Sequence, residues 1–198
     1  MVKRIFDILS SLIGLVVLSP VLLIIAVLIK ILTPGPVFFF QKRTGRHGVP
    51  FTIVKFRTMK VENSGSTTSV KGDSRITNLG AVLRKYKLDE LPELLNVLIG
   101  DMSLVGPRPD TYEFTSRLKD NERCILELRP GITGPATLKY SGEEDLLASV
   151  NDPIQYTDEI IWPDKVRLNV EYYQNRSFIG DIILIFKTLT KGFRRKPQ

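Results

Sequence analysis

Residues 8–32 read ILSSLIGLVVLSPVLLIIAVLIKIL, and Lys30 is the only charged residue among them. These 25 residues suffice for one helical crossing of a hydrocarbon layer about 30 Å thick. The run is too long for a secretory signal peptide and lacks a small-residue cleavage site. We therefore expect residues 1–32 to attach the chain to a membrane and residues 33–198 to form a domain at the membrane surface.

Ser19 and Pro20 interrupt the apolar segment at its centre. Proline removes a backbone donor and clashes with the preceding turn, so a helix should bend or break there, and the Ser19 hydroxyl can bond the freed carbonyl. Each half is about a dozen residues, or roughly 18 Å of helix, too short to span alone. Two topologies follow, a kinked span or a helix–break–helix that enters and leaves one leaflet. The apolar pattern by itself favours the kinked span, whereas the basic residues Lys3, Arg4 and Lys30 near both ends favour two cytoplasmic ends.

The composition excludes several kinds of site. There are 28 Lys and Arg against 21 Asp and Glu, and the net charge of +7 favours anionic partners such as nucleic acid, phospholipid headgroups or phosphorylated substrates. A single cysteine, Cys124, excludes an intrachain disulfide, and a single histidine, His47, excludes a multi-histidine metal site. Acid–base or nucleophilic chemistry therefore falls to carboxylates, lysines or hydroxyls. Attachment to a membrane makes nucleic acid the least attractive partner, and we expect none.

The remaining sequence predicts an α+β fold that is mainly helical. Val37–Lys42 and Phe51–Arg57 are rich in β-branched and aromatic residues and flank a glycine-rich loop, which predicts a short β-hairpin. Glu62–Asp73 is polar and predicts a loop. Apolar periodicity predicts a helix beginning at Thr77 and further helices at Glu90–Ile99, Asp110–Cys124 and Asp164–Gln174.

The C-terminal segment from Phe178 repeats apolar residues at helical spacing and ends in Arg194, Arg195 and Lys196. An apolar helical face followed by basic residues is typical of an amphipathic helix that lies at an anionic membrane interface. The alternative is a helix that packs its apolar face on the core and leaves a solvated basic tail.

Adjacent carboxylates occur in the pentapeptide Leu88-Asp89-Glu90-Leu91-Pro92. Proline is tolerated in the first turn of a helix, so Asp89 is predicted as the N-cap and Glu90 as a first-turn residue. The helix dipole would then keep Asp89 ionised, which suits a nucleophile or a Mg²⁺ ligand. The alternative is that both residues only cap the helix.

Three basic residues have local sequences that favour binding of a phosphate group. Arg108 lies between Pro107 and Pro109, which stiffen its backbone, and a guanidinium binds phosphate with paired hydrogen bonds. Arg129 precedes a turn whose glycines would allow an anion to approach the backbone. Lys55 alternates with apolar neighbours and projects from one strand face together with Arg57; an exposed basic face is the alternative.

These motifs carry a resemblance to a known family. The segments that match in order are Pro34–Phe39, Lys55–Met59, Asp73–Thr77, Leu88–Leu98, Gly100–Pro109 and Arg129–Gly134. In this respect the chain resembles the bacterial sugar transferases, the small monotopic phosphoglycosyl transferases that act on polyprenyl phosphate.

The resemblance implies a reaction and its residues. A phospho-sugar would pass from a UDP-sugar donor to polyprenyl (undecaprenyl) phosphate with release of UMP, the first membrane step of a bacterial glycoconjugate pathway. Asp89 matches the nucleophile that forms a covalent phosphosugar intermediate, and Glu90 matches its partner in metal positioning or proton transfer. Mg²⁺ is the implied cofactor, with Asp89 as a ligand. The residues implied in phosphate binding are Lys55, Arg108, Arg84, Arg75 and Arg129.

The resemblance also implies the topology and location. Ser19-Pro20 matches the break that makes the family's N-terminal helix re-entrant, so both ends are expected on the cytoplasmic face of the bacterial inner membrane, in contact with membrane lipids. The chain departs from many members at Pro135-Ala136-Thr137, where Trp-Ala-Gln is common. Neither the donor sugar nor the oligomeric state follows from the sequence.

Two other hypotheses remain open. In the first, transfer occurs in one step, with Asp89 as a base and no covalent intermediate. In the second, the chain is a basic, membrane-attached scaffold or binding protein without turnover.

Overall fold

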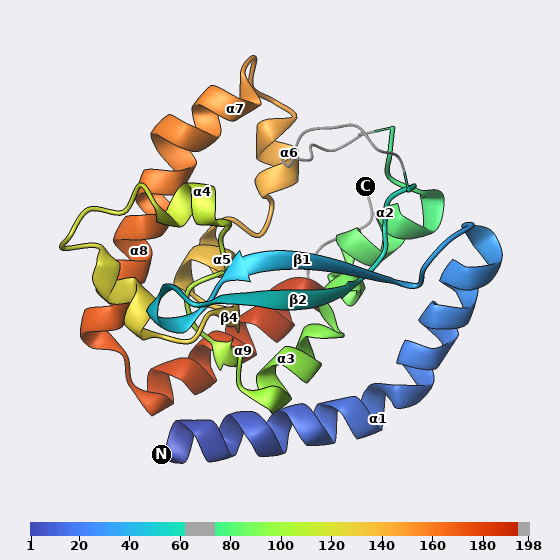
Figure 1. Cartoon of the computed structure of the whole chain (residues 1–198), viewed down its shortest axis with the longest axis horizontal. Helices are drawn as coiled ribbons and strands as arrows, with labels where there is room; N and C mark the ends of the chain where they lie inside the picture. The colour runs from blue at the N-terminus through green and yellow to red at the C-terminus, as the bar shows by residue number, and fades with distance from the viewer. Residues whose placement is uncertain (62–73, 194–198) are drawn as a thin grey trace.

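The computed structural model describes residues 1–61 and 74–193, so the predicted loop Glu62–Asp73 and the basic cluster Arg194–Lys196 lie outside this part. The hairpin of β1 and β2 lies at the centre of a mainly helical molecule, with α1 along its lower and right-hand margins (Figure 1). The named helices and strands, in chain order, are α1 (Val2–Leu32), β1 (Phe38–Thr44), β2 (Pro50–Phe56), α2 (Asn78–Lys85), α3 (Glu93–Ile99), β3 (Ser103–Val105), α4 (Tyr112–Thr115), β4 (Gly131–Thr133), α5 (Pro135–Lys139), α6 (Glu143–Leu147), α7 (Pro153–Tyr156), α8 (Trp162–Asn175) and α9 (Phe178–Phe193).

Helix α1 bends but does not break. It is continuous from Val2 to Leu32 with Pro20 inside it, and Figure 1 shows a change of direction near its middle. The Ser19 hydroxyl donates to the carbonyl of Val16 over 2.8 Å. Val16 is four residues before Pro20, so its carbonyl is the one that loses a regular helical bond. The predicted break is therefore a bend, because Ser19 supplies the missing hydrogen bond.

The N-terminal half of α1 is tied to the globular part by polar contacts. Arg4 donates to the carbonyls of Val97 and Leu98 at 2.6 and 2.9 Å, at the C-terminal end of α3. Buried Asp7 accepts from the backbone N–H of Leu104 at 3.1 Å. These contacts hold the first turns of α1 alongside α3 and β3.

The C-terminal half of α1 packs into an apolar cluster instead. The buried members of this cluster are Ile25, Ile29, Phe56 and Leu83. Buried Arg57 donates to the carbonyls of Thr33 and Pro34 at 2.8 and 2.6 Å, which binds the end of the helix to the hairpin. Of the described helices, α1 alone has the length and composition to cross a bilayer. It nevertheless shares a core with the hairpin, and the division into residues 1–32 and 33–198 stays a prediction.

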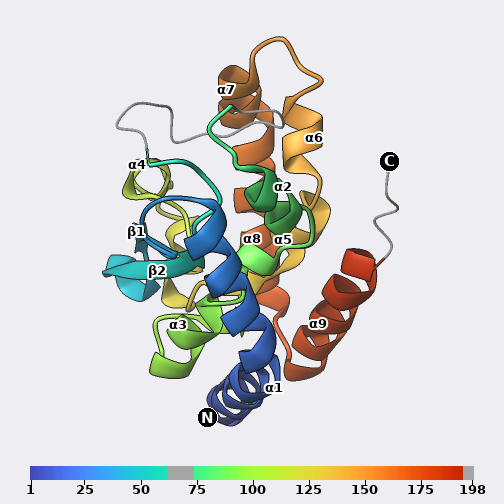
Figure 2. The ribbon, with the colours of Figure 1, turned by 90° about the vertical axis from the view of Figure 1, so that its right-hand side faces the viewer.

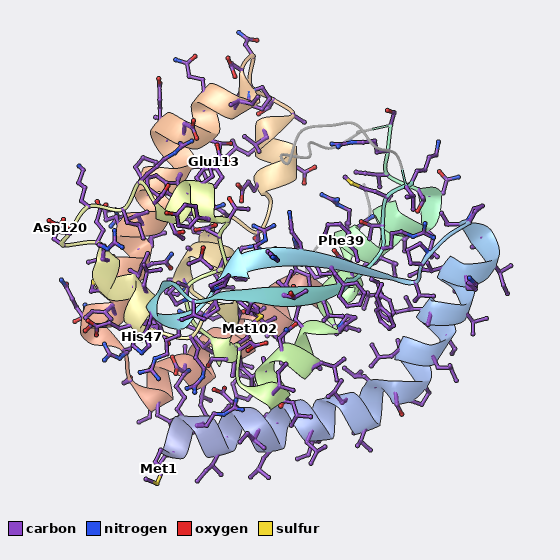
Figure 3. All side chains as sticks on the ribbon, in the orientation of Figure 1. Met1, Phe39, His47, Met102, Glu113 and Asp120 are labelled. Atoms are coloured by element: carbon purple, nitrogen blue, oxygen red, sulfur yellow. The ribbon has the colours of Figure 1, made fainter. Side chains whose placement is uncertain are left out.

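The predicted hairpin is confirmed. β1 and β2 pair antiparallel, with Phe38 opposite Phe56 and Thr44 opposite Pro50. His47 lies in the turn between them, at the end of the hairpin remote from Phe39 (Figure 3). Thr77 caps α2, as its hydroxyl accepts from the N–H of Gly80 at 2.9 Å.

Two features differ from the prediction. The helix predicted at Asp110–Cys124 is wrong, because α4 ends at Thr115 and a 3₁₀ turn begins only at Arg123. Asp120 and Asn121 are turn formers, and the Glu122 side chain accepts from the N–H of Lys119 at 2.8 Å, which stabilises a turn. The second sheet, in which β3 and β4 pair in parallel, was not predicted.

Helix α9 matches the predicted C-terminal helix and leaves apolar side chains in solvent. The exposed residues are Ile179, Ile183, Phe186 and Leu189, at the spacing of one helical face. On the other side, buried Asp181 pairs with Lys3 of α1 and accepts from the Tyr172 hydroxyl at 2.6 Å. Figure 2 shows α9 beside the N-terminal part of α1. The core-facing alternative is therefore wrong for these four side chains.

Candidate active site

The polar face of α3 is buried against the hairpin. Asn96, 1% exposed, accepts from the N–H of Val54 at 3.1 Å and donates to the carbonyl of Thr52 at 2.8 Å. An amide side chain can do both at once, so Asn96 satisfies the edge of β2 in place of a third strand. The next residue of β2 is Lys55, and its Nζ lies 3.1 Å from Oε1 of Glu93, the first residue of α3.

Asp89 and Glu90 lie in a 3₁₀ turn, Leu88–Glu90, rather than in the helix. Lys87 precedes the turn in the left-handed conformation, with φ of 58°. The helix begins at Glu93 after Pro92, and no side chain caps it. The prediction of Asp89 as the N-cap is therefore wrong, because residues 88–90 form a separate 3₁₀ turn and α3 begins only at Glu93.

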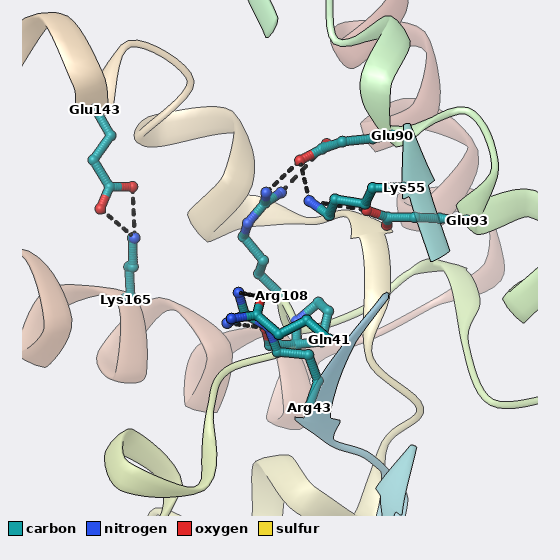
Figure 4. A network of polar contacts seen from close by, with 9 residues as sticks. Gln41, Arg43, Lys55, Glu90, Glu93, Arg108, Glu143 and Lys165 are labelled. Atoms are coloured by element: carbon teal, nitrogen blue, oxygen red, sulfur yellow. Dashed lines mark hydrogen bonds and ion pairs between the residues drawn. The ribbon is translucent and has the colours of Figure 1, made fainter. Parts of the chain in front are cut away.

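Glu90 is the centre of a buried ion-pair network (Figure 4). Its carboxylate accepts from both terminal nitrogens of Arg108, and its Oε1 lies 2.9 Å from Lys55 Nζ. Burial alone would raise the pKa of Glu90, but the charges of Arg108 and Lys55 outweigh it and hold that pKa well below its usual range. Glu90 is thus a fixed anion that orients two cations.

Asp89 is in a different environment from its neighbour. The residue is partly exposed, yet its Oδ1 is buried and has no hydrogen-bond partner in residues 1–61 or 74–193. Burial and then the adjacent Glu90 charge raise the pKa of Asp89, against the opposing charges of Lys55, Lys87 and Arg84. An unpaired and more basic carboxylate is a better nucleophile than one held in an ion pair.

Glu93 is a site residue that the sequence analysis missed. Its side chain is 3% exposed, and its Oε1 lies 3.1 Å from Lys55 Nζ, so Lys55 bridges two carboxylates. Burial raises the pKa of Glu93 to about 7, in spite of the Lys55 charge. The sequence does contain an indication, because Glu90 and Glu93 are three residues apart, the spacing of side-chain neighbours on a helix. The leucines around them indicated instead that the opposite face of the helix is buried.

A second group of polar side chains lies next to Arg108. Arg43 lies beside it in Figure 4 and donates to Gln41 Oε1 at 2.6 Å. Burial and then the Arg108 charge lower the pKa of Arg43, while Asp110 opposes them. Across the site, Lys165 of α8 donates to both oxygens of Glu143 at 2.6 and 2.8 Å. Arg43 and Lys165 were not singled out from the sequence.

The other predicted phosphate-binding residues lie in three different places. Arg84 is in the last turn of α2, and its charge acts on Asp89. The backbone carbonyl of Arg75 accepts from the N–H of Lys60 at 2.9 Å, next to the part of the chain that is not described. Arg129 Nε donates to the carbonyl of Gly100 at 2.7 Å, beyond the far end of α3. The structure therefore brings Lys55 and Arg108 to the dyad but not Arg129.

The glycines after Arg129 allow two backbone segments to lie close together. A Cβ at Gly131 would lie 2.1 Å from the N of Gly106, and one at Gly134 would lie 2.3 Å from the Gly106 carbonyl oxygen. Only glycine allows so close an approach of two chains. The space that was expected to admit an anion is thus filled by the segment that leads to Arg108.

A divalent cation fits this donor set in one particular way. The described residues contain no group of three or more His, Cys, Asp and Glu side chains that could enclose a metal ion. Mg²⁺ commonly keeps several waters and binds through one or two carboxylates together with substrate phosphates. The unpaired Oδ1 of Asp89 is the oxygen suited to such a shared ion, because both Glu90 and Glu93 already face Lys55.

The chain is similar to known proteins over most of its length. A UDP-N-acetylgalactosamine-undecaprenyl-phosphate N-acetylgalactosaminephosphotransferase of Aeromonas hydrophila is 38% identical over 200 residues, which cover 95% of this chain and 43% of the relative. A UDP-glucose:undecaprenyl-phosphate glucose-1-phosphate transferase of Escherichia coli strain K12 is 37% identical over 202 residues, covering 99% and 41%. Exopolysaccharide production protein PSS of Rhizobium leguminosarum bv. phaseoli is 38% identical over 203 residues, covering 98% and 96%.

The chain spans less than half the length of the first two relatives and nearly the whole of the third. The model of a family described as bacterial sugar transferase matches residues 1–195. The resemblance drawn from the sequence motifs is thereby confirmed, and the chain belongs to the bacterial sugar transferase family.

Proposed function

We propose that this chain is a phosphoglycosyl transferase that moves a sugar 1-phosphate from a UDP-sugar to undecaprenyl phosphate and releases UMP. The observation that carries the proposal is the contrast within the dyad. Glu90 is locked between Arg108 and Lys55, whereas the adjacent Asp89 has an unpaired buried oxygen. Glu90 positions the two cations that would bind a diphosphate, and Asp89 is available to react.

The proposed reaction has two displacements. An oxygen of Asp89 attacks the phosphorus that carries the sugar, and the bond from this phosphorus to the bridging oxygen breaks, so UMP leaves with that oxygen. The phosphosugar is then an acyl phosphate on Asp89. An oxygen of undecaprenyl phosphate attacks the same phosphorus, restores the Asp89 carboxylate and yields undecaprenyl-diphosphate-sugar.

Residues of this chain have distinct parts in both steps. Arg108 and Lys55 bind non-bridging phosphate oxygens and stabilise charge that develops on them. Glu90 holds both cations in place through its ion pairs with them. Mg²⁺ bound by Asp89 and the diphosphate would neutralise charge on the leaving UMP.

The contacts of α1 support a re-entrant topology. Arg4 and Asp7 near its start, and Ile25 and Ile29 near its end, contact the same globular part. A straight span would place these two ends on opposite sides of a bilayer about 30 Å thick. We therefore place the chain at the cytoplasmic face of a bacterial inner membrane, with the bend of α1 in the bilayer.

Two relatives bear names that specify undecaprenyl phosphate and a nucleotide-linked sugar. Their named sugars differ, so the donor here is proposed only as a UDP-sugar. Transfer of the first sugar phosphate to the lipid would begin assembly of a glycoconjugate.

The test is UMP release from a panel of UDP-sugars with undecaprenyl phosphate and Mg²⁺ in detergent. We expect one or a few donors to support release, and we expect chelation by EDTA and the Asp89→Asn variant to abolish it. Asp120→Asn is the matched control, because Asp120 lies in an exposed loop at the outer margin of the molecule (Figure 3). If folded wild-type protein released no UMP from any donor, the result would favour a scaffold without turnover.

A further inference from the structure

We propose that Glu93 is a positioning residue that acts through Lys55, holding its ammonium group where it can bind a phosphate oxygen of the donor. This inference rests on the proposed function and adds to it a residue outside the Asp89–Glu90 pair.

Lys55 needs more than one partner to be fixed. Its side chain is a flexible four-carbon stem with three N–H donors, and one ion pair leaves it free to rotate. Glu90 Oε1 at 2.9 Å and Glu93 Oε1 at 3.1 Å contact the ammonium together. The contact with Glu90 is a hydrogen bond, whereas Glu93 Oε1 attracts the ammonium as an ion pair without a hydrogen bond. The two carboxylates together define the position of the ammonium, and N–H groups of Lys55 are left for a ligand.

Glu90 cannot perform this role alone, because it is shared. Arg108 also binds Glu90, and the two cations approach the same oxygen, Oε1. Without Glu93, Lys55 and Arg108 would share one carboxylate, and Lys55 would be free to move towards unpaired Asp89. Glu93 therefore holds the Lys55 ammonium away from Asp89, the proposed nucleophile. The ammonium then stays available to a phosphate oxygen of the donor.

The position of Glu93 is itself rigid. It is the first residue of α3 and is 2% exposed, and Asn96 of the same helix is bonded to the backbone of β2, the strand that carries Lys55. The lysine and its partner are thus on two elements that cannot easily move apart. The other charged groups around Glu93 are Glu90, Arg108 and Arg43.

A kinetic double-mutant cycle tests the inference. Steady-state and single-turnover UMP release are measured for wild type, Glu93→Leu, Lys55→Met and the double variant. We expect Glu93→Leu to lower kcat/KM by about tenfold, the low end of what losing an orienting partner costs. In the Lys55→Met background the same substitution should change kcat/KM by less than about twofold, since a residue that acts through another has no effect once that other is absent.

Conservative variants separate positioning from packing. Glu93→Gln keeps the volume of the side chain but removes the charge that attracts Lys55, so it should lower kcat/KM by about tenfold, as Glu93→Leu does. It also serves as the test variant if Glu93→Leu fails to fold. Glu171→Leu, an exposed glutamate on α8, is the control for removal of a helical carboxylate.

Equal losses in the presence and absence of Lys55 would overturn the inference, as would wild-type kcat/KM in folded Glu93→Leu. If the folded wild-type chain released no UMP from any donor, the proposed function would be contradicted, and this inference with it. An active wild type with additive losses would contradict the inference alone.

Discussion

The guanidinium of Arg108 binds both oxygens of the Glu90 carboxylate from a position 18 residues further along the chain. The pair joins the turn before α3 to the rigid proline-flanked segment after β3, and Lys55 adds a contact from the hairpin. Three segments of the chain thus meet at one carboxylate, and the site depends on all of them.

Loss of Arg108 should therefore affect both folding and turnover. We expect Arg108→Met to lower the free energy of unfolding by about 2 kcal/mol, less than for breaking a fully buried ion pair, because the Arg108 side chain is 32% exposed and Lys55 still faces Glu90. Thermal unfolding in detergent measures this change. Arg108→Lys should recover part of the stability but little UMP release, since an ammonium does not replace a two-pronged guanidinium. Full activity in Arg108→Lys would argue against paired hydrogen bonds to phosphate.

Glu93 should make stability depend on pH. Its pKa is about 7 in the folded chain against 4.5 in the unfolded one, so the folded state binds the extra proton between these values and loses stability as pH rises from about 4.5 to 7. Glu93→Gln removes this dependence, and its stability relative to wild type should rise by about 3 kcal/mol across that range, at 1.4 kcal/mol per pH unit. Melting temperatures of both proteins in buffers from pH 4.5 to 8 provide the measurement. A difference that stays constant with pH would show that Glu93 is already ionised at the low end.

Asn96 should be essential to the hairpin. Replacement by alanine leaves the partly buried N–H of Val54 and carbonyl of Thr52 without their side-chain partner, at an expected cost of about 1–3 kcal/mol. Asn96→Asp should be as harmful, because a carboxylate cannot donate to the Thr52 carbonyl. Hydrogen exchange at Val54 reports the loss locally, and unchanged protection there would contradict the role assigned to Asn96.

The topology of α1 can be tested by labelling. In a Cys124→Ser background, single cysteines at Val2 and Lys60, both exposed, should react with a membrane-impermeant maleimide from the same side of sealed vesicles. Labelling from opposite sides would eliminate the re-entrant arrangement. Pro20→Ala should straighten α1 and weaken the contacts of Arg4 with α3, because the bend is what returns both ends to the globular part.

The sequence predicted the features that depend on local pattern. The hairpin, the Thr77 cap of α2 and the helix from Phe178 follow from residue alternation, side-chain capping and apolar periodicity, which involve only neighbours in the chain. The residues Lys55 and Arg108 were also found, because strand alternation and flanking prolines mark them. The wrong helix at Asp110–Cys124 shows the limit of the same method, since its periodicity was real but turn formers interrupted it.

The features that were missed depend on contacts between distant segments. The apolar residues of α3 suggested which face is buried, yet Glu93 and Asn96 on its polar face are among its most buried residues, because β2 supplies their partners. Arg129 was predicted to bind phosphate from the glycine-containing turn that follows it, but its side chain donates to the carbonyl of Gly100 at the far end of α3. No periodicity in the sequence encodes such pairings.

The central claim is that Asp89 becomes covalently bonded to the phosphosugar. The most direct measurement is intact-protein and peptide mass spectrometry after incubation with the active UDP-sugar and Mg²⁺ in the absence of undecaprenyl phosphate. We expect an added mass of one sugar phosphate on the peptide that contains Asp89, its removal on adding the lipid acceptor, and its absence in Asp89→Asn. UMP release that requires the acceptor, with no adduct at any time point, would contradict the claim and favour transfer in one step.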